Sequence, residues 1–276
     1  MTKFFERTPR RAVIRALNAL LILAVLPSST AISVAVTAGN QAPADRTAAW
    51  ADIAKLPDWD GIWLPHIGDQ RDQEKGNVAP WSEASAEIIN NMMKAEDEGR
   101  PAGIFNDCMP EGMPTWMMIS HNAMEFQYSP GRITLLGESD GNRLRRIYTD
   151  GRAHPQDPDL TYHGHSIAHW EKETLVVDTI GVDPDAYIAI TEAVGVRNGG
   201  DMHIVERIYL VDEDTLHDEI TIIAPTVMTK PWKTTRIFKR LRGAQYDIVE
   251  GVCLMGMDID QVDEDGNAVF DPSIFE

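Results

Sequence analysis

Four of the chain's eight histidines lie within sixteen residues, so the stretch from Tyr148 to Glu171 is the first place to look for chemistry. The stretch reads YTDGRAHPQDPDLTYHGHSIAHWE, and its histidines are His154, His163, His165 and His169. Clustered imidazoles can hold a metal ion, act as general acids and bases near neutral pH, or form one polar face of a strand. Their spacing helps to choose among these three interpretations.

A metal site would use the two closest histidines, His163 and His165. Side chains alternate between the two faces of a strand, so His163, His165 and His169 share a face if residues 162–171 form a strand. His165 and His169 are then about 13 Å apart along the strand, at about 3.3 Å per residue, which is too far for one ion. A zinc-dependent hydrolase using His163 and His165 is therefore kept only as an alternative.

Acid–base chemistry asks less of the geometry. If His165 and His169 point into a barrel, the preceding run RLRRIYTDGRAHP brings further titratable groups to the same pocket. Arg146 would bind a substrate carboxylate through two parallel hydrogen bonds, and Tyr148 and His165 would transfer protons. The predicted catalytic set is His165, Tyr148, Arg146, Asp150, His154 and His169. Within it, Asp150 would orient a neighbouring histidine.

Other strands supply fainter candidates for contact with a substrate. They are Glu125, Arg207, Tyr209 and Trp170. Each of these side chains, and each member of the catalytic set, also has a structural interpretation. Asp150-Gly151 is a strong turn dipeptide, and arginines such as Arg146 can pair with surface carboxylates at little gain in stability.

Net charge limits the range of partners. The full chain carries 25 basic and 43 acidic residues, a formal charge of −18. Such a field repels phosphate backbones and anionic membranes, so nucleic acid is excluded as a partner. The chain has no G-x-G-x-x-G or G-x-x-x-x-G-K-[ST] motif, and we expect no cofactor.

The first 38 residues have the pattern of a secretory signal peptide. A basic start, with Arg10 and Arg11, precedes an apolar run at residues 16–26, and small residues lead to Ala38. The apolar run is about eleven residues long, shorter than the roughly 20 needed for a membrane-spanning helix. The sequence therefore predicts a periplasmic or secreted protein without stable membrane insertion. A retained signal anchor is the alternative.

The two cysteines, Cys108 and Cys253, are predicted to form a disulfide, because an even pair in an exported protein usually does. The bond would close a long loop and would stabilise the fold by about 4–5 kcal/mol in the chain-entropy model. Two unpaired buried thiols are the alternative. Asp107 and Glu111 beside Cys108 would raise a thiol pKa and argue against a nucleophile.

Periodicity predicts one helix followed by a long series of strands. WSEASAEIINNMMKAEDEGR has an N-cap at Ser82, helical spacing of apolar residues and a stop at Gly99. About nine short runs rich in Val, Ile, Thr and Tyr follow between tight turns, ending with YDIVEGVC. Short turns imply antiparallel pairing, and we expect a closed barrel, with a β-sandwich as the alternative.

Two resemblances add to this prediction. Gly61-Ile62-Trp63 resembles the G-x-W start of lipocalin-like barrels, in which the tryptophan plugs the barrel base and a late-strand basic residue packs on it. Arg236 or Arg242 would supply that residue here. RRIYTDGRAHP, HWEKETLVVDT and TKPW also resemble a broad group of secreted bacterial proteins, over most of residues 59–253. Neither resemblance brings an activity.

The predicted protein is thus mostly β, an antiparallel calycin-like barrel with one N-terminal helix. Its segments are a signal peptide at 1–38, a flexible lead-in at 39–58, a single β-barrel domain at 59–256 and an acidic C-terminal tail at 257–276. The leading function is a cofactor-independent lyase, a decarboxylase or hydratase/dehydratase, on a small aromatic or hydrophobic carboxylate. A lipocalin-like small-molecule binding protein without catalysis is the second function, and the sequence leaves a homodimer open.

Overall fold

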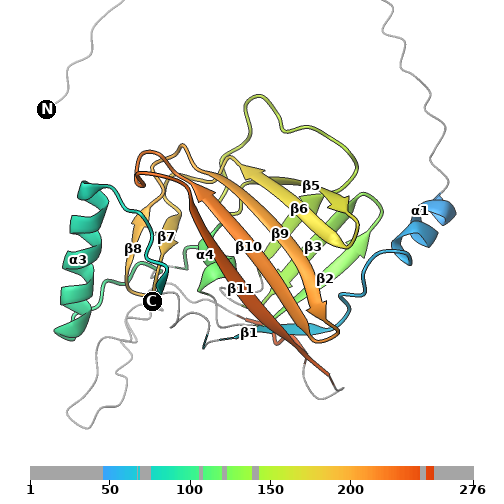
Figure 1. The fold of residues 1–276 in the computed structure, drawn as a ribbon, viewed down its shortest axis with the longest axis horizontal. Coiled ribbons are helices and arrows are strands. Elements are labelled where there is room, and N and C mark those ends of the chain that lie inside the picture. Colours follow the sequence, from blue (N-terminus) through green and yellow to red (C-terminus); the bar gives the residue numbers. More distant parts are fainter. Residues whose placement is uncertain are drawn as a thin grey trace, which may run out of the picture. The chain divides into compact units, whose positions relative to one another are not determined.

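The computed structural model describes residues 46–66, 68, 76–105, 108–119, 123–138, 143–242 and 247–251, and its main feature is a closed barrel of nine strands (Figure 1). The barrel strands are β1 (Ile62–Pro65), β2 (Met124–Ser129), β3 (Arg132–Gly137), β4 (Leu144–Tyr148), β5 (His165–Glu171), β6 (Thr174–Ile180), β9 (His203–Asp212), β10 (Thr215–Ile223) and β11 (Trp232–Leu241). The predicted antiparallel calycin-like barrel is confirmed, and the strands do not form the alternative β-sandwich.

The strand order around the barrel is β1-β11-β10-β9-β6-β5-β4-β3-β2, and β2 pairs with β1 to close it. Neighbouring strands run antiparallel except β4 and β5, which are parallel. This exception follows from the long connection at residues 149–164, since parallel neighbours need a crossover rather than a tight turn. A small hairpin, β7 (Tyr187–Ala189) and β8 (Gly195–Arg197), lies in the chain between β6 and β9.

The helices whose full bounds the structure describes are α1 (Arg46–Ile53), α3 (Glu83–Asp97) and the short α4 (Thr115–Met118). The predicted helix is α3, and Ser82 caps it by accepting a hydrogen bond from the Ser85 amide. Its buried residues are Ser85 and Ile89, whereas the neighbouring Ile88 is 49% exposed. The helix packs against β8 (Figure 1).

Some other local predictions need correction. The lead-in at residues 39–58 contains helix α1, and the hairpin β7–β8 was missed. The strand predicted in YDIVEGVC is wrong where the structure describes it, since residues 247–251 have no regular structure. Residues 1–38, Cys253 and residues 257–276 lie outside the described residues, so the signal peptide, the disulfide and the acidic tail stay predictions.

The G-x-W resemblance is matched by a tryptophan–arginine contact at one end of the barrel. Trp63 is fully buried and donates from its indole nitrogen to the Trp59 carbonyl at 3.0 Å. The arginine over its ring is Arg240, at 4.6 Å, rather than Arg236 or Arg242. Arg240 is the pairing partner of Trp63 across β1 and β11, so the strand register decides which arginine makes the cation–π contact.

Charged side chains lie inside the barrel as well as apolar ones. Arg145 of β4 is 1% exposed, and its Nη1 donates to Glu206 of β9 at 2.8 Å while its Nη2 donates to the other carboxylate oxygen. The same guanidinium donates to the hydroxyl of Ser166 on β5 and, at 3.0 Å, to that of Thr179 on β6. One arginine therefore ties together four strands, across the parallel junction of β4 and β5.

A second carboxyl group, Asp218 of β10, is fully buried beside this pair. Burial raises the pKa of Asp218 well above its usual value, and the negative charge of Glu206 adds to the rise. Two adjacent buried carboxyl groups are destabilised when both are ionised, so the neutral form of Asp218 is favoured beside Glu206. Across β10 and β11, Asp218 pairs with Arg236, which is also buried.

No helix among the described residues has both the length and the apolar character that crossing a membrane would require.

Arg145→Met is predicted to lower the free energy of unfolding by about 3–5 kcal/mol, because it leaves Glu206 buried and unpaired beside Asp218. Arg207→Met is the matched control. Arg207 lies beside Glu206 on β9 and makes an exposed ion pair with Glu171 of β5, so this substitution should lower the free energy of unfolding by less than about 1 kcal/mol. Urea unfolding of the two variants checks this, and equal losses would contradict a structural role for the buried pair.

Candidate functional site

The histidines of β5 lie on the outside of the barrel. Ser166 is buried with Arg145 in the interior, and the alternation along β5 therefore points His165 and His169 outward. His169 is largely exposed and lies 3.4 Å from Glu171. The prediction that His165 and His169 face a barrel interior is wrong, because the face of β5 that points into the barrel is the one with Ser166.

Part of the predicted catalytic set nevertheless lines one cavity on this outer wall. The cavity has a volume of about 810 Å³ and runs beside β4, the 149–164 connection and the start of β5. We call it the outer cleft; its walls include Arg146, Tyr148, Leu160, Tyr162, His163 and His165. Arg146 and Tyr148 lie on the same face of β4, and the buried Arg145 lies on the opposite face.

A chain of hydrogen bonds reaches His165 from β6. Asp178 accepts from the Nε2 of His154 at 3.0 Å, and the Nδ1 atoms of His154 and His165 are 2.9 Å apart. His203 of β9 also contacts the same Asp178 oxygen through its Nε2, at 2.9 Å. Burial, and then the charges of His154 and Arg152, lower the pKa of His165.

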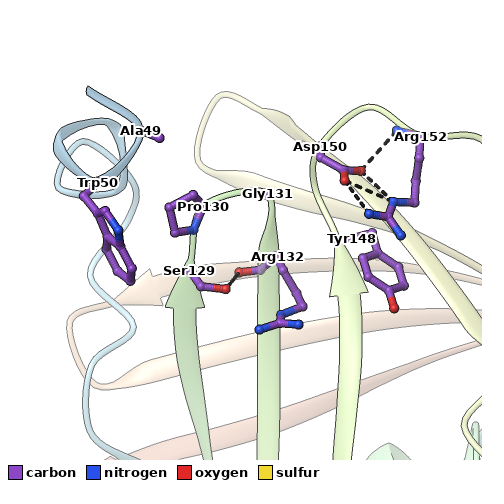
Figure 2. Close-up of a pocket in the computed structure, with 9 residues that line it drawn as sticks. All are labelled: Ala49, Trp50, Ser129, Pro130, Gly131, Arg132, Tyr148, Asp150 and Arg152. Atoms are coloured by element: carbon purple, nitrogen blue, oxygen red, sulfur yellow. Dashed lines mark hydrogen bonds and ion pairs between the residues drawn. The ribbon is translucent and has the colours of Figure 1, made fainter. Parts of the chain in front are cut away.

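Asp150 has a different role from the predicted one. It forms an exposed ion pair with Arg152 at 2.6 Å, whose guanidinium lies 3.8 Å over the ring of Tyr148. Figure 2 shows this group at the rim of a separate cavity of about 450 Å³, between the β2–β3 turn and α1 with Trp50. Asp178, rather than Asp150, is the carboxylate that orients His154.

His163 is a neutral, buried histidine at one end of the outer cleft. Its ring packs against Trp116 with the centroids 5.0 Å apart, and neither ring nitrogen has a hydrogen-bond partner in the protein. Burial lowers its pKa to about 4, and the positive charges of Arg145 and Arg143 contribute to the decrease. His163 is therefore uncharged at neutral pH.

The predicted substrate-binding residues do not gather with this cluster. Trp170 packs against Trp59 at 5.2 Å and belongs to the core. Arg207 pairs with Glu171 at 2.9 Å, and the Tyr209 hydroxyl donates to Glu219 at 2.9 Å. Glu125 accepts a hydrogen bond from Gln127 on the outer face of β2. Their predicted contact with one shared substrate lacks geometric support, because each of the four residues lies in a different part of the barrel.

The zinc alternative also lacks support from the part of the chain that the structure describes. His163 and His165 both line the outer cleft, but among the described residues no three His, Cys, Asp or Glu groups converge on a point where a metal ion would sit. The nitrogen of His165 that faces His154 is engaged in a hydrogen bond.

A further cavity, largely apolar, opens between α3 and the start of β11. Its volume is about 600 Å³, and we call it the α3 cleft; its walls include Trp81, Ile89, Met93, Met118, Trp232 and Arg236. Hydrogen bonds hold the segment before α3 to β11: the Trp232 indole donates to the Asn77 carbonyl at 3.1 Å, and the Asn77 side chain donates to the Lys233 carbonyl at 2.8 Å.

Sequence reasoning missed Asp178 and the place of Arg236 in the α3 cleft. Asp178 is the one carboxylate in the otherwise apolar run TLVVDTI, and such an isolated charge in a strand is a usable signal. Arg236 was one of the two arginines, with Arg242, predicted to pack on Trp63. Its actual place, opposite Asp218, follows only from the register of β10 and β11.

No protein-family model matches the chain, and no curated protein matches its sequence. Among solved structures, a protein titled REP1-NXSQ fatty acid transporter is 9% identical, with a TM-score of 0.31, and the match covers 70% of this chain and 98% of that one. Zebrafish ileal bile acid-binding protein with cholic acid is 10% identical, with a TM-score of 0.32, over 66% and 98%. At these values neither likeness carries an argument about function, and the barrel assignment rests on the strand pairing.

His163 predicts a pH dependence of stability. Its pKa is lower in the folded chain than the usual 6.5, so the unfolded chain binds the proton more tightly and stability falls as pH drops from about 6.5 to about 4. The full loss is roughly 3 kcal/mol. In His163→Phe, urea unfolding at pH 7 and pH 4.5 should show a smaller difference than in the wild type.

His169→Phe is the matched control, because His169 is exposed, and it should keep the wild-type difference between the two pH values. An unchanged difference in His163→Phe would mean that His163 titrates normally in the folded protein.

Proposed function

We propose that this protein is a small-molecule binding barrel and that its ligand, an apolar molecule carrying a carboxylate, binds in the α3 cleft. The single observation that carries the proposal is Arg236, a buried guanidinium in the wall of a largely apolar cavity. Ligand sites are commonly apolar cavities of about 300–1,000 Å³ with a few polar groups that fix orientation. The α3 cleft, at about 600 Å³, has this composition.

The walls of the cleft suit an aromatic or aliphatic body. Trp81 and Trp232 offer flat apolar surface, and Met93 and Met118 offer flexible side chains that adapt to different shapes. Met93 is 48% exposed on α3, so part of this surface contacts water in the free protein. Covering it with a ligand would remove apolar area from water, which favours binding by about 25 cal/mol per Å².

The interior charges favour an anionic head group at the inner end. The positive charge of Arg145 is balanced by Glu206, and Asp218 opposite Arg236 is held neutral by burial and by Glu206. A carboxylate of the ligand would contact the guanidinium of Arg236, which lines the cleft. An arginine can bind a carboxylate through two parallel hydrogen bonds, an arrangement that a neutral alcohol cannot reproduce.

Binding without catalysis is the version of the function that we propose for this cleft. The lyase predicted from the sequence required His165 and His169 to face the interior, and they lie on the outer wall. The predicted export would present the protein to ligands in the periplasm or the medium, and we retain that localisation as part of the proposal.

Met93→Asp tests the location of the site. Displacement of anilinonaphthalene sulfonate by decanoate, followed by fluorescence, should give a dissociation constant roughly tenfold higher in the variant, because a carboxylate replaces apolar wall and repels the ligand. Ile88→Asp is the matched control: Ile88 lies on the same helix, is 49% exposed and does not line the cleft. Its effect should stay within about twofold.

Decanol in the same assay tests the role of Arg236 without altering a buried residue. Wild-type protein should bind decanoate more tightly than decanol. Equal weakening by Met93→Asp and Ile88→Asp, or tighter binding of decanol, would contradict the proposal.

A further inference from the structure

We propose that the outer cleft is a second ligand site, which binds a small aromatic carboxylate at Arg146 and couples that binding to the uptake of a proton by His165. The site is on the outer wall of β4 and β5, uses no residue of the α3 cleft and does not depend on the function proposed above. Three observations support it: an available cation, an ordered chain of imidazoles and an unsatisfied polar wall.

Arg146 is the available cation. It is exposed on the outer face of β4 and lines the cleft, and among the described residues it makes no ion pair. Carboxylates are abundant in this chain, so an arginine left without one beside a cavity is well placed to bind an anion from solution. Tyr148, Leu160 and Tyr162 provide the flat and apolar surface that an aromatic ring would contact.

The ordered imidazoles fix where a proton can be added. With Asp178 ionised, His154 donates its Nε2 proton to that carboxylate at 3.0 Å, and its Nδ1 is left as an acceptor. His165 then donates its Nδ1 proton to His154 across 2.9 Å. The lone pair on Nε2 of His165 is the free basic position, and a proton from the acid form of the buffer can add there without breaking either hydrogen bond.

Titratable and charged groups lie around His165 on several elements. On β4 and its connection they are Tyr148, whose ring stacks on His165 at 5.4 Å, and Arg152, which lowers the pKa of His165 together with burial and His154. Asp178 acts through His154 from β6. Further charged groups on the cleft wall are Arg143, Arg146, Asp159 and Asp183. In the free protein His165 is therefore largely neutral at pH 7, and a bound carboxylate would favour its protonated form.

His163 supplies the unsatisfied polar wall. It lines the same cleft, it is buried, and both of its ring nitrogens lack a partner in the protein. Buried polar atoms of this kind are nearly always satisfied by a ligand or an ordered water. This observation on His163 is independent of the geometry of Arg146 and His165, and it supports a polar ligand in the same cavity.

Isothermal titration of the full-length protein with benzoate at pH 7, in two buffers of different ionisation enthalpy, measures the proton uptake. We expect a net fraction of a proton to be taken up per benzoate bound, because a nearby carboxylate raises the pKa of an imidazole. His165→Gln should bind benzoate without this uptake. His169→Gln is the matched control on the same strand and outer face, and it should keep the uptake.

Two further variants locate the ligand. Arg146→Gln should weaken benzoate binding by about tenfold, whereas Arg132→Gln removes the same charge from the adjacent strand without touching the outer cleft and should change it less than about twofold. Met93→Asp, which blocks the α3 cleft, should leave both affinity and proton uptake unchanged.

Absence of benzoate binding, uptake that survives His165→Gln, or equal effects of Arg146→Gln and Arg132→Gln would each overturn the proposal. Loss of benzoate binding in Met93→Asp would place benzoate in the α3 cleft, which would refute the second site while supporting the first.

Discussion

The buried contact between Arg145 and Glu206 constrains everything else in this barrel. An arginine that lies inside needs a carboxylate and several further acceptors, and Glu206, Ser166 and Thr179 are positioned to supply them. Each of these partners lies on a different strand, so the contact sets the relative positions of β4, β5, β6 and β9. It also bridges the parallel β4–β5 junction, which has the fewest backbone pairs of the neighbouring strands in this part of the barrel.

The same contact decides which residues face outward. Because side chains alternate along a strand, Arg145 inside places Arg146 and Tyr148 outside, and Ser166 inside places His165 outside. The acid–base cluster is therefore a feature of the outer wall, where residues of β4, the 149–164 connection and β5 line one cavity. The interior charges continue through Asp218 to Arg236, which brings a guanidinium to the mouth beneath α3. Two chemically different cavities thus follow from one buried arginine.

Much of the fold could be predicted from the sequence, because strand periodicity and turn chemistry are local. The runs that became β2 to β6 and β9 to β11 were placed by alternating apolar residues and short turns. Facing was harder. Arg145 and Arg146 are identical and adjacent, and only the distant Glu206 distinguishes them. Similarly, Ile88 and Ile89 are neighbours on α3, and the packing of α3 against strand β8 determines which one is buried.

The candidate sites depend on such long-range contacts, so their residues could be predicted locally but their arrangement could not. Arg146, Tyr148, His154 and His165 were recognised as a group, but Asp178 completes it from a strand that read as purely structural. The most direct test of the whole account is a crystal structure of the protein with decanoate. Our account predicts the aliphatic chain against Met93 and the carboxylate at Arg236, with Arg145 and Glu206 still paired. Decanoate inside the barrel, separating Arg145 from Glu206, would contradict it.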